Sequence, residues 1–514
     1  MKIDLKNKKT NIIVSAVVLA VAFVVALVMG FHFASFSAFV AYFNTDRVDE
    51  TQKFSRYSST LEGTAGDADI FVMIGSENTV ALVKKDAQAD FDTPEKIAAA
   101  RVTGVRGTAQ LSAAQSTLAG TDILQVSSSD EAVGAVKAGT ADVAVLSYAQ
   151  AKAAVTADET LAISAAEVEK VPSLLLLGGT HPNEPSGQLA ATVFLENAEV
   201  ERGKLYVITE TNRSAYTHSM PQEASTWYYD LTTKNGKTRT FKFGARPTNT
   251  NQQWPNPDVY VHSSGQNLSA TEVRNINRAY PGSATGNYTE RVAYAIAELI
   301  RENDITMVVD LHEAAPEYIT INAMVAHQDS MDLATIAKVL YLDGYSEVTQ
   351  KGDSRTEAGD FVDGINISLE QSPVTLHGLT HRELGDYTNA YVFLCETSNA
   401  SQGKLRGSFN EDLITYERPD KFYEYAAGIS GLLYARPVSI NERVGRHVQS
   451  VLSIVSAFNE ECYTRNTLSA GSVNKLSDDQ KRAGVYVGKF RWGNVPEYVN
   501  LLDDGVGYYL ADPQ

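Results

Sequence analysis

Apolar and polar positions divide this chain into an N-terminal apolar run, a polar stretch, and two segments in which strand-like and helix-like patterns alternate. Residues 12–30 are almost wholly aliphatic, and no Lys, Arg, Asp or Glu occurs between Thr10 and Thr45. At about 1.5 Å per residue, this run is long enough to cross roughly 30 Å of hydrocarbon as a helix. The pattern therefore predicts a transmembrane helix.

The residues that flank the apolar run predict its orientation. Four lysines lie within the first nine residues, and the positive-inside rule keeps such a segment in the cytoplasm. We expect residues 1–43 to form a cytoplasmic N-terminus and a single-pass membrane anchor, with the rest of the chain outside the cytoplasmic membrane. A cleaved signal peptide is the alternative because small residues occur at 34–41, although the apolar run is long for such a peptide.

A smaller α/β unit is expected after a polar linker at residues 44–68. Short apolar runs that suit strands alternate with helix-like spacing at 93–100 and 129–139. The expected strands are 69–75, 79–85, 100–107, 121–127 and 141–147. The order of these elements resembles one lobe of a periplasmic solute-binding protein, so we assign residues 69–165 to an accessory α/β domain.

A larger α/β unit is expected over residues 170–440, followed by a C-terminal helix and short strands over 441–514. Strands alternate here with strongly periodic helices, which predicts a parallel sheet with crossover helices. The expected strands are 173–179, 204–212, 305–312 and 387–398, with short strands and turns at 485–504. The expected helices are 187–199, 289–303, 418–435 and 441–461.

Composition and charge narrow the classes of function. The chain has 514 residues, 44% of them apolar, and this is enough for two or three domains with a sizeable core. A formal net charge of −18 disfavours binding to a phosphate backbone, so no nucleic-acid partner is expected. Two cysteines, Cys395 and Cys462, are too few for a thiolate zinc site, although one disulfide between them is not excluded.

Candidate chemistry lies where three apolar strands end. His181 and Glu184 follow the run SLLLLGG, His312 follows MVVDL, and Glu396 follows YVFLC. In open α/β sheets the ligand crevice lies along the carboxyl edge of the strands, so these side chains are expected to converge. Two imidazoles and one carboxylate leave one coordination position open on a tetrahedral zinc ion, as in catalytic zinc sites.

Four stretches carry a resemblance to a known family. GGTHPNEPSG, NRAYPG, DLHEA and CETS resemble the succinylglutamate desuccinylase and aspartoacylase group of the zinc carboxypeptidase superfamily. The resemblance covers residues 170–440 and implies a mixed sheet flanked by helices. It also implies that His181, Glu184 and His312 bind Zn²⁺. In the same way it implies that Asn277 and Arg278 hold a substrate carboxylate, with Glu396 as the general base.

The resemblance also implies a second arginine that stabilises the oxyanion. Arg246 in FGARPTNT and Arg274 in TEVRN both compete for this role. Arg246 is preferred because its Gly, Pro and Asn neighbours suggest a shaped loop, whereas Arg274 suggests a helix face. Arg382 and Tyr387 are candidates for a residue that closes over the substrate.

Some neighbouring residues are assigned supporting roles or none. Asp310 either orients the His312 imidazole or is a simple turn acid. Glu313 is expected to point away from His312, because adjacent residues of a strand face opposite sides. The histidines other than His181 and His312 are expected on the surface or in loops.

The predicted function is zinc-dependent hydrolysis of an amide bond next to a free carboxylate, in N-acyl amino acids or short peptides. The expected partners are such a substrate and the membrane. The alternative is a membrane-anchored ligand-binding or sensor protein whose zinc site has lost its catalytic role.

Overall fold

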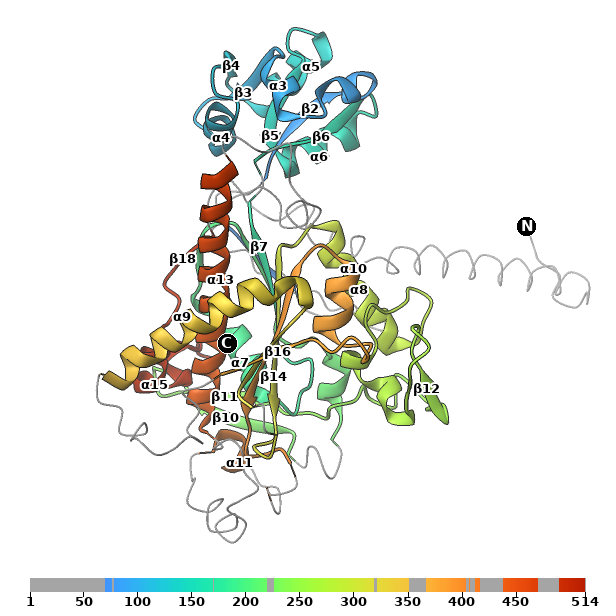
Figure 1. Ribbon diagram of the computed structural model, residues 1–514, viewed down its shortest axis with the longest axis vertical. Coiled ribbons are helices and arrows are strands. Elements are labelled where there is room, and N and C mark those ends of the chain that lie inside the picture. The colour runs from blue at the N-terminus through green and yellow to red at the C-terminus, as the bar shows by residue number, and fades with distance from the viewer. Residues whose placement is uncertain are drawn as a thin grey trace, which may run out of the picture.

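A computed structural model describes residues 70–75, 78–169, 171–219, 226–318, 321–350, 367–403, 406, 412–416, 438–469 and 490–513. Within these ranges no helix combines the length and the apolar character needed to cross a membrane. The expected anchor and linker at 1–68 lie outside the described residues, as does the expected helix at 418–435. What is described is a mixed α/β fold with a larger and a smaller sheet domain (Figure 1).

A seven-stranded mixed sheet forms the centre of the larger domain, in the order β1-β9-β7-β14-β17-β15-β16. β7, β9, β14 and β17 run parallel to one another, β1 and β15 are antiparallel to their neighbours β9 and β17, and β16 is parallel to β15. The bounds are Ile70–Ile74, Lys204–Ile208, Ser173–Leu177, Met307–Ala314, Tyr391–Ser398, Ala323–Ala326 and Ser368–Gln371 in that spatial order.

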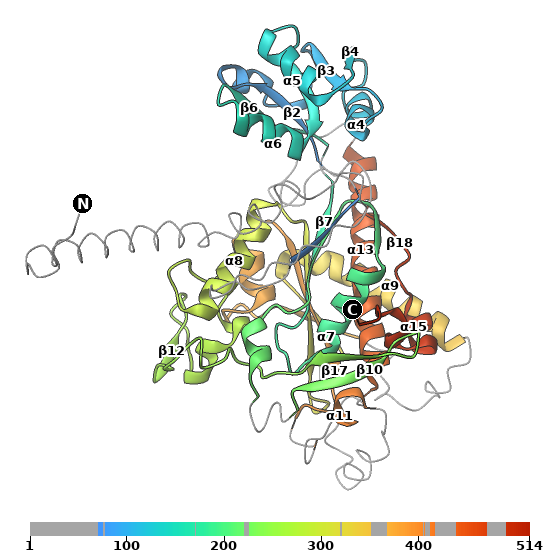
Figure 2. The ribbon, with the colours of Figure 1, turned by 180° about the vertical axis from the view of Figure 1, so that it is seen from behind.

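Helices cover both faces of this sheet. α7 (Pro185–Asn197), α9 (Met331–Gln350) and α13 (Ile440–Ser469) pack on one face, and α8 (Tyr288–Glu302) packs on the other. The two views of the ribbon show the same arrangement (Figures 1 and 2). With apolar helices on both sides, every leucine of β7 is fully buried. This explains why β7 reads as a continuous apolar run, as strands buried on both faces do.

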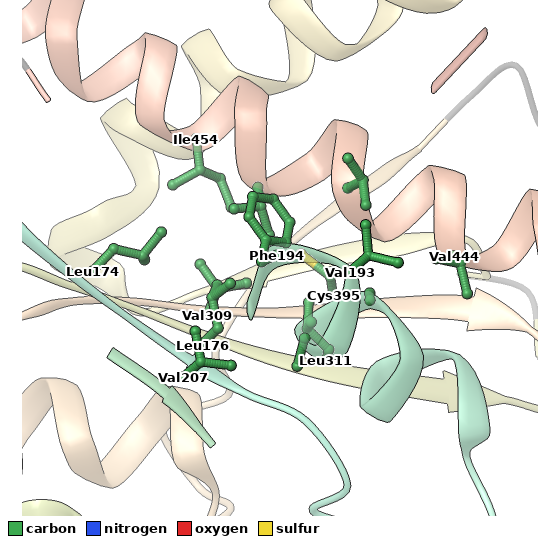
Figure 3. Packing of buried hydrophobic residues seen from close by; sticks show 14 of the residues in the cluster. Leu174, Leu176, Val193, Phe194, Val207, Val309, Leu311, Cys395, Val444 and Ile454 are labelled. Carbon is green, nitrogen blue, oxygen red and sulfur yellow. The ribbon is translucent and has the colours of Figure 1, made fainter. Parts of the chain in front are cut away.

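Side-chain alternation along the strands separates two hydrophobic cores. Leu176, Val309 and Cys395 point toward α7 and α13, where they meet Phe194 and Ile454 (Figure 3). The intervening residues face α8 in the second core. Because side chains alternate with period two, this register also sends Asp310 and His312 to the α8 face and Glu313 to the α13 face.

The smaller domain contains a five-stranded sheet in the order β4-β3-β5-β2-β6. Its strands are β2 (Thr79–Lys84), β3 (Val102–Val105), β4 (Ile123–Val126), β5 (Val143–Ser147) and β6 (Leu161–Glu169). Its helices are η1 (Lys85–Phe91), α3 (Pro94–Ala98), α4 (Ala109–Thr117), α5 (Ser129–Ala138) and α6 (Tyr148–Ala157). This domain stands at one end of the molecule in both ribbon views (Figures 1 and 2).

Short elements complete the larger domain. Three two-stranded sheets pair β8 (Glu199–Arg202) with β18 (Arg491–Gly493), β10 (Tyr228–Thr232) with β11 (Thr238–Lys242), and β12 (Val259–Val261) with β13 (Asn267–Ser269). The short helices are η2 (Arg213–Thr217), η3 (Ala270–Arg274), η4 (Ile276–Arg278), η5 (Gln328–Ser330), η7 (Thr380–Leu384), α10 (Gly385–Tyr387), α11 (Asp412–Thr415), α15 (Tyr498–Asp504) and η10 (Val506–Tyr509).

The structure differs from the sequence-based expectations in two places. The strand expected at 69–75 in the smaller domain pairs instead with β9 of the larger sheet, so the smaller domain is inserted between β1 and β7. A buried apolar run predicts a strand but carries no information on which sheet it joins. Residues 498–504, expected among short strands and turns, form the helix α15, whose Tyr498 and Leu501 are buried on one side.

Candidate metal centre

The turn between β7 and α7 brings His181 and Glu184 together. Gly179 takes a positive φ of 66° at the start of this turn, and a Cβ there would lie 2.3 Å from the Tyr216 hydroxyl. Gly187 lets α7 approach β14, since a Cβ would lie 2.2 Å from the Leu311 carbonyl oxygen. Glycine is therefore required at both positions for the turn to fit beneath the neighbouring strand.

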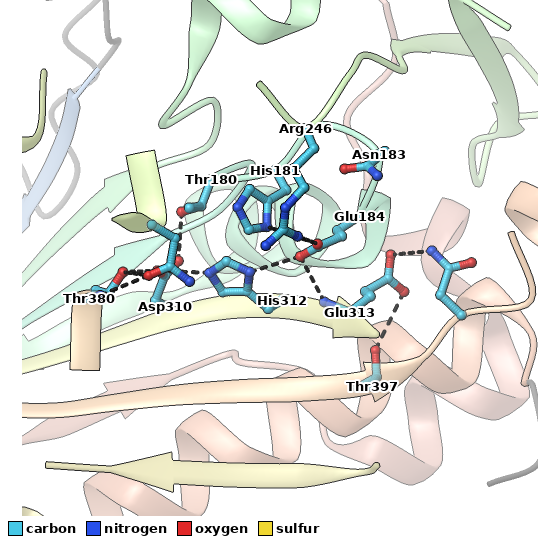
Figure 4. A network of polar contacts seen from close by, with 12 residues as sticks. Thr180, His181, Asn183, Glu184, Arg246, Asp310, His312, Glu313, Thr380 and Thr397 are labelled. Carbon is cyan, nitrogen blue, oxygen red and sulfur yellow. Dashed lines mark hydrogen bonds and ion pairs between the residues drawn. The ribbon is translucent and has the colours of Figure 1, made fainter. Parts of the chain in front are cut away.

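Three side chains from this turn and β14 converge on one point. His181 Nδ1 lies 2.8 Å from Glu184 Oε1, and His312 Nδ1 lies 2.8 Å from Glu184 Oε2 (Figure 4). All three residues are buried, and their potential ligand atoms lie within 4.8 Å of one another. This buried group could hold a metal ion.

The outer nitrogen of the His181 ring has a partner that fixes its tautomer. His181 Nε2 lies 2.9 Å from Asn275 Oδ1. The orientation of the Asn275 amide is itself fixed, because its Oδ1 also accepts from the Asn277 backbone N–H and its Nδ2 donates to Glu272. His181 Nε2 must therefore carry the hydrogen, which leaves the Nδ1 lone pair of the neutral ring facing Glu184.

An acid lies close to the outer nitrogen of the His312 ring. Its Nε2 lies 2.9 Å from Asp310 Oδ2, and Asp310 accepts hydrogen bonds from the hydroxyls of Thr180 and Thr380 at 2.7 and 2.6 Å. Figure 4 shows Asp310 on the outer side of the His312 ring. Metal-binding histidines commonly donate their second N–H to such a partner. Asp310 therefore lies where it would orient His312.

The electrostatics of the group follow from burial and from these partners. Burial and the nearby Arg246 guanidinium lower the pKa of His181 to about 4, so this ring is neutral. Burial lowers the pKa of His312 as well, but the carboxylates of Asp310 and Glu184 outweigh burial and raise it. Burial would raise the pKa of Glu184, whereas the two imidazoles hold it well below its usual range. A lone pair facing a carboxylate at 2.8 Å requires a proton or a cation between the two atoms.

The donor set fits zinc. Two imidazole nitrogens and one carboxylate are the ligands of several catalytic zinc sites, with bonds of about 2.0–2.2 Å and a fourth position left open. A tetrahedron of that size has edges of about 3.3 Å. Around an ion the two 2.8 Å contacts would lengthen, and the donor separations, which reach up to 4.8 Å in the group, would shorten toward this value.

Glu396 stands beside His312. The two residues are register partners on the parallel strands β14 and β17, and both side chains face the α8 side of the sheet. Glu396 Oε2 is buried and has no hydrogen-bond partner among the described residues. Burial, followed by the negative charge of Glu184, raises the pKa of Glu396 to about 7. A metal cation in the group would lower this value.

The two arginines that competed for the oxyanion role lie in different surroundings. Arg246 Nη1 lies 3.2 Å from both His181 Nδ1 and Glu184 Oε1, at the centre of the group. Arg274 is buried in η3 and donates to the Thr248 carbonyl and to Asn256 Oδ1 at 2.6 and 2.9 Å. Arg274 therefore holds the loop that follows Arg246.

Arg278 and Asn277 lie next to the group. Burial and the positive charge of Arg246 lower the pKa of Arg278, while Glu272, Glu396 and Glu184 act in the opposite direction. Its Nε lies 3.6 Å from Glu272 Oε2. Asn277 Oδ1 accepts from the backbone N–H of Thr380 at 2.8 Å, which leaves the amide nitrogen of Asn277 for a ligand.

The proposed closing residues are engaged in other contacts. The Tyr387 hydroxyl donates to Glu298 at 3.0 Å, and Arg382 pairs with Asp386 at 3.0 Å. Neither contact involves a residue of the metal group.

The expectation that the remaining histidines lie on the surface or in loops is wrong for His447, which is buried on α13, and for His381, which is buried in η7. His262 and His327 lie in loops as expected, but their side chains are buried and meet polar partners. Turns carry no hydrophobic periodicity that would reveal such burial. Asn275, Thr180 and Thr380 were also missed, because a polar residue in a turn gives no local sign of the ligand it supports.

Comparisons with known proteins give partial similarities. No family model and no curated protein matches the chain. An amino acid ABC transporter substrate-binding protein from Streptococcus pneumoniae, bound to L-arginine, is 19% identical over 24% of this chain and 46% of its own, with a TM-score of 0.17. Tripeptide-bound cell shape determinant Csd4 from Helicobacter pylori is 14% identical over 56% of this chain and 51% of its own, with a TM-score of 0.31. The chain thus spans about half or less of the length of these structures.

Proposed function

We propose that this protein is a zinc-dependent hydrolase that cleaves an amide bond next to a free carboxylate, in N-acyl amino acids or short peptides. The observation that carries the proposal is the convergence of two imidazole Nδ1 atoms on one buried carboxylate, with Asn275 bonded to the outer nitrogen of His181 and Asp310 lying 2.9 Å from that of His312. Such a cluster of acceptors suits a divalent cation. When bound, Zn²⁺ supplies Lewis-acid polarisation of a carbonyl and makes water more acidic.

Glu396 is the proposed general base. Its buried Oε2 has no hydrogen-bond partner in the part of the chain that the structure describes, and Glu396 lies on the strand next to His312, so it can accept a hydrogen from water at the metal group. The water oxygen bonds to the carbonyl carbon as Glu396 takes its proton. Glu396 then passes this proton to the nitrogen as the C–N bond breaks, which gives a carboxylic acid and an amine.

The arginines are proposed to bind the two ends of the reacting group. Arg246 Nη1 lies 3.2 Å from His181 Nδ1 and Glu184 Oε1 and can donate to a developing oxyanion, a type of contact worth roughly 3 to 4 kcal/mol. Arg278 offers a planar fork that suits bidentate binding of a terminal carboxylate. The free Nδ2 of Asn277 can donate to the same carboxylate.

Family and location are part of the proposal. The four motifs support membership of the succinylglutamate desuccinylase and aspartoacylase group, and the strand order of the smaller sheet suits one lobe of a solute-binding protein. The apolar run after four lysines supports a single-pass anchor with the catalytic domain outside the cytoplasmic membrane. Protease accessibility of intact cells, before and after membrane rupture, tests this location.

The test of the activity uses the full-length protein in detergent. Zinc content is measured by elemental analysis, and turnover is measured on a panel of N-acyl amino acids and short peptides with free carboxylates. Hydrolysis by the wild type, and its loss in Glu396→Gln with zinc retained, would support the proposal. Bound zinc with no hydrolysis of any compound would favour the sensor alternative. A folded protein that binds no zinc would refute the metal site.

A further inference from the structure

A buried ion pair lies beneath the metal group, on the opposite face of the sheet. Arg443 of α13 donates from Nη1 to Glu313 Oε1 at 2.7 Å, and both side chains are fully buried. Arg443 Nη2 donates to the Ile414 carbonyl, and Glu313 Oε2 accepts from Asn399 Nδ2 at 3.1 Å. Glu313 directly follows His312 on β14, and it points away from the metal group (Figure 4).

Stability alone is a weak reason for this pair. Removing two charges from water carries a desolvation penalty that their attraction often fails to offset, and apolar residues of similar volume often replace such pairs without loss. Neighbouring residues of α13, among them Val444 and Val448, belong to the apolar core on this face of the sheet. The contacts of Glu313 point to a different role for this pair.

Glu313 touches the segment of Glu184 at two points. Its backbone N–H donates to Glu184 Oε2 at 3.0 Å, the same oxygen that faces His312 Nδ1. Its carboxylate Oε2 accepts from the Ser186 backbone N–H at 3.1 Å, two residues beyond Glu184. One residue thus fixes both the carboxylate of Glu184 and the backbone of the helix start that carries it.

We propose that Arg443 and Glu313 are positioning residues for the metal ligand Glu184. Arg443 anchors the Glu313 carboxylate, and Glu313 holds β14, the start of α7 and the Glu184 carboxylate in one arrangement. The inference rests on the proposed metal site. It extends that site to α13, a helix more than a hundred residues further along the chain.

The same helix offers a matched control. Arg446 and Glu442 form a second buried ion pair on α13 at 2.6 Å, with side chains 2% and 4% exposed. This pair joins two residues within α13. Neutralising either pair removes one buried Glu charge and one buried Arg charge, but Glu313 and Arg443 join β14 to α13, and Glu313 contacts the segment of Glu184.

The experiment compares Glu313→Gln/Arg443→Met with Glu442→Gln/Arg446→Met in the full-length protein. Zinc dissociation constants are measured by competition with a chromophoric chelator, and thermal unfolding is measured on the metal-free proteins. The first double variant should bind zinc about 10- to 100-fold more weakly, the usual effect of losing an outer contact of a ligand. The control should bind zinc as the wild type does. Equal affinities in both double variants, or equal losses, would overturn the positioning role.

A milder pair of variants decides the question if the first double variant does not fold. Arg443→Lys keeps the charge but cannot contact Glu313 and the Ile414 carbonyl together, and Arg446→Lys is its control. Zinc affinity should fall several-fold in Arg443→Lys alone, and no fall would overturn the inference. His312→Ala separates the two levels. If wild type and His312→Ala bind zinc equally weakly, the metal site itself is wrong, whatever the α13 variants do.

Discussion

Replacing Glu396 by Gln should abolish activity and stabilise the metal-free protein. Gln keeps the size of the side chain and removes the charge from an oxygen that has no partner among the described residues. General-base catalysis typically contributes 10²- to 10⁴-fold, or about 3 to 5 kcal/mol of the barrier. We expect kcat to fall by that factor while one zinc ion stays bound.

The stability change follows from the pKa of Glu396. In the metal-free fold it is raised from 4.5 to about 7, because burial and the charge of Glu184 disfavour the ionised form. Because the pKa is raised in the fold, Glu396 contributes its full stability below pH 4.5, where it is protonated, and this contribution is lost as the pH rises through 7. At about 1.4 kcal/mol per unit, the full loss is roughly 3 kcal/mol. Gln does not ionise, so Glu396→Gln should recover most of this at pH 8.

The assay is chemical denaturation of chelator-treated protein at pH 5 and pH 8, together with turnover of the zinc-loaded protein. Glu370→Gln is the matched control, since Glu370 lies half-buried on β16 of the same sheet and should change neither quantity. A Glu396→Gln variant that keeps activity would refute the general base. A Glu396→Gln variant that is less stable than the wild type at pH 8 would refute the claim that the charge of Glu396 destabilises the metal-free fold.

Three further predictions test other parts of the site. Asn275→Ala removes the acceptor of His181 Nε2 and should weaken zinc binding about 10- to 100-fold in chelator competition, whereas Asn275→Asp, which keeps an acceptor, should lose much less. Arg278→Lys should lower kcat/KM about 10-fold or more for substrates with a free carboxylate, and it should leave a methyl ester of the same substrate unaffected. Burial, followed by the charge of His312, lowers the pKa of His381 to about 3. The contribution of His381 to stability is then complete above pH 6.5 and falls as the pH drops toward 3. His381→Asn can still pair with Ser372. In denaturant titrations its free energy of unfolding should fall with decreasing pH less steeply than that of the wild type, by up to about 1.4 kcal/mol per pH unit.

The strands and their ends were the predictable part of this protein. β7 is the apolar run SLLLL, followed by the turn that carries His181 and Glu184, and β14 carries His312 near its carboxyl end; parallel strands of one sheet end on one edge. This geometry alone brings His181 and Glu184 near His312, and the structure places them there. The α/β class followed from the same alternation, and it is confirmed.

Local sequence patterns do not predict the residues that support the metal ligands. Asn275 lies in a turn, and its role depends on a ring that is 94 positions away. Arg443 lies on the buried face of its helix, where apolar residues are expected, and the sequence alone does not show that Glu313 is its partner. Contacts of this kind are set by tertiary packing, which neither periodicity nor propensity records.

The insertion of the smaller domain has a practical consequence for anyone who trims the chain. Strand β1, at residues 70–74, is the outer neighbour of β9 and precedes the whole inserted domain. A fragment that begins near residue 170 would contain the rest of the larger domain but would lack β1. Its β9 would then expose a row of unpaired backbone N–H and C=O groups. Such an open edge invites aggregation. Excising the inserted domain while splicing residue 75 to residue 172 would keep that border closed.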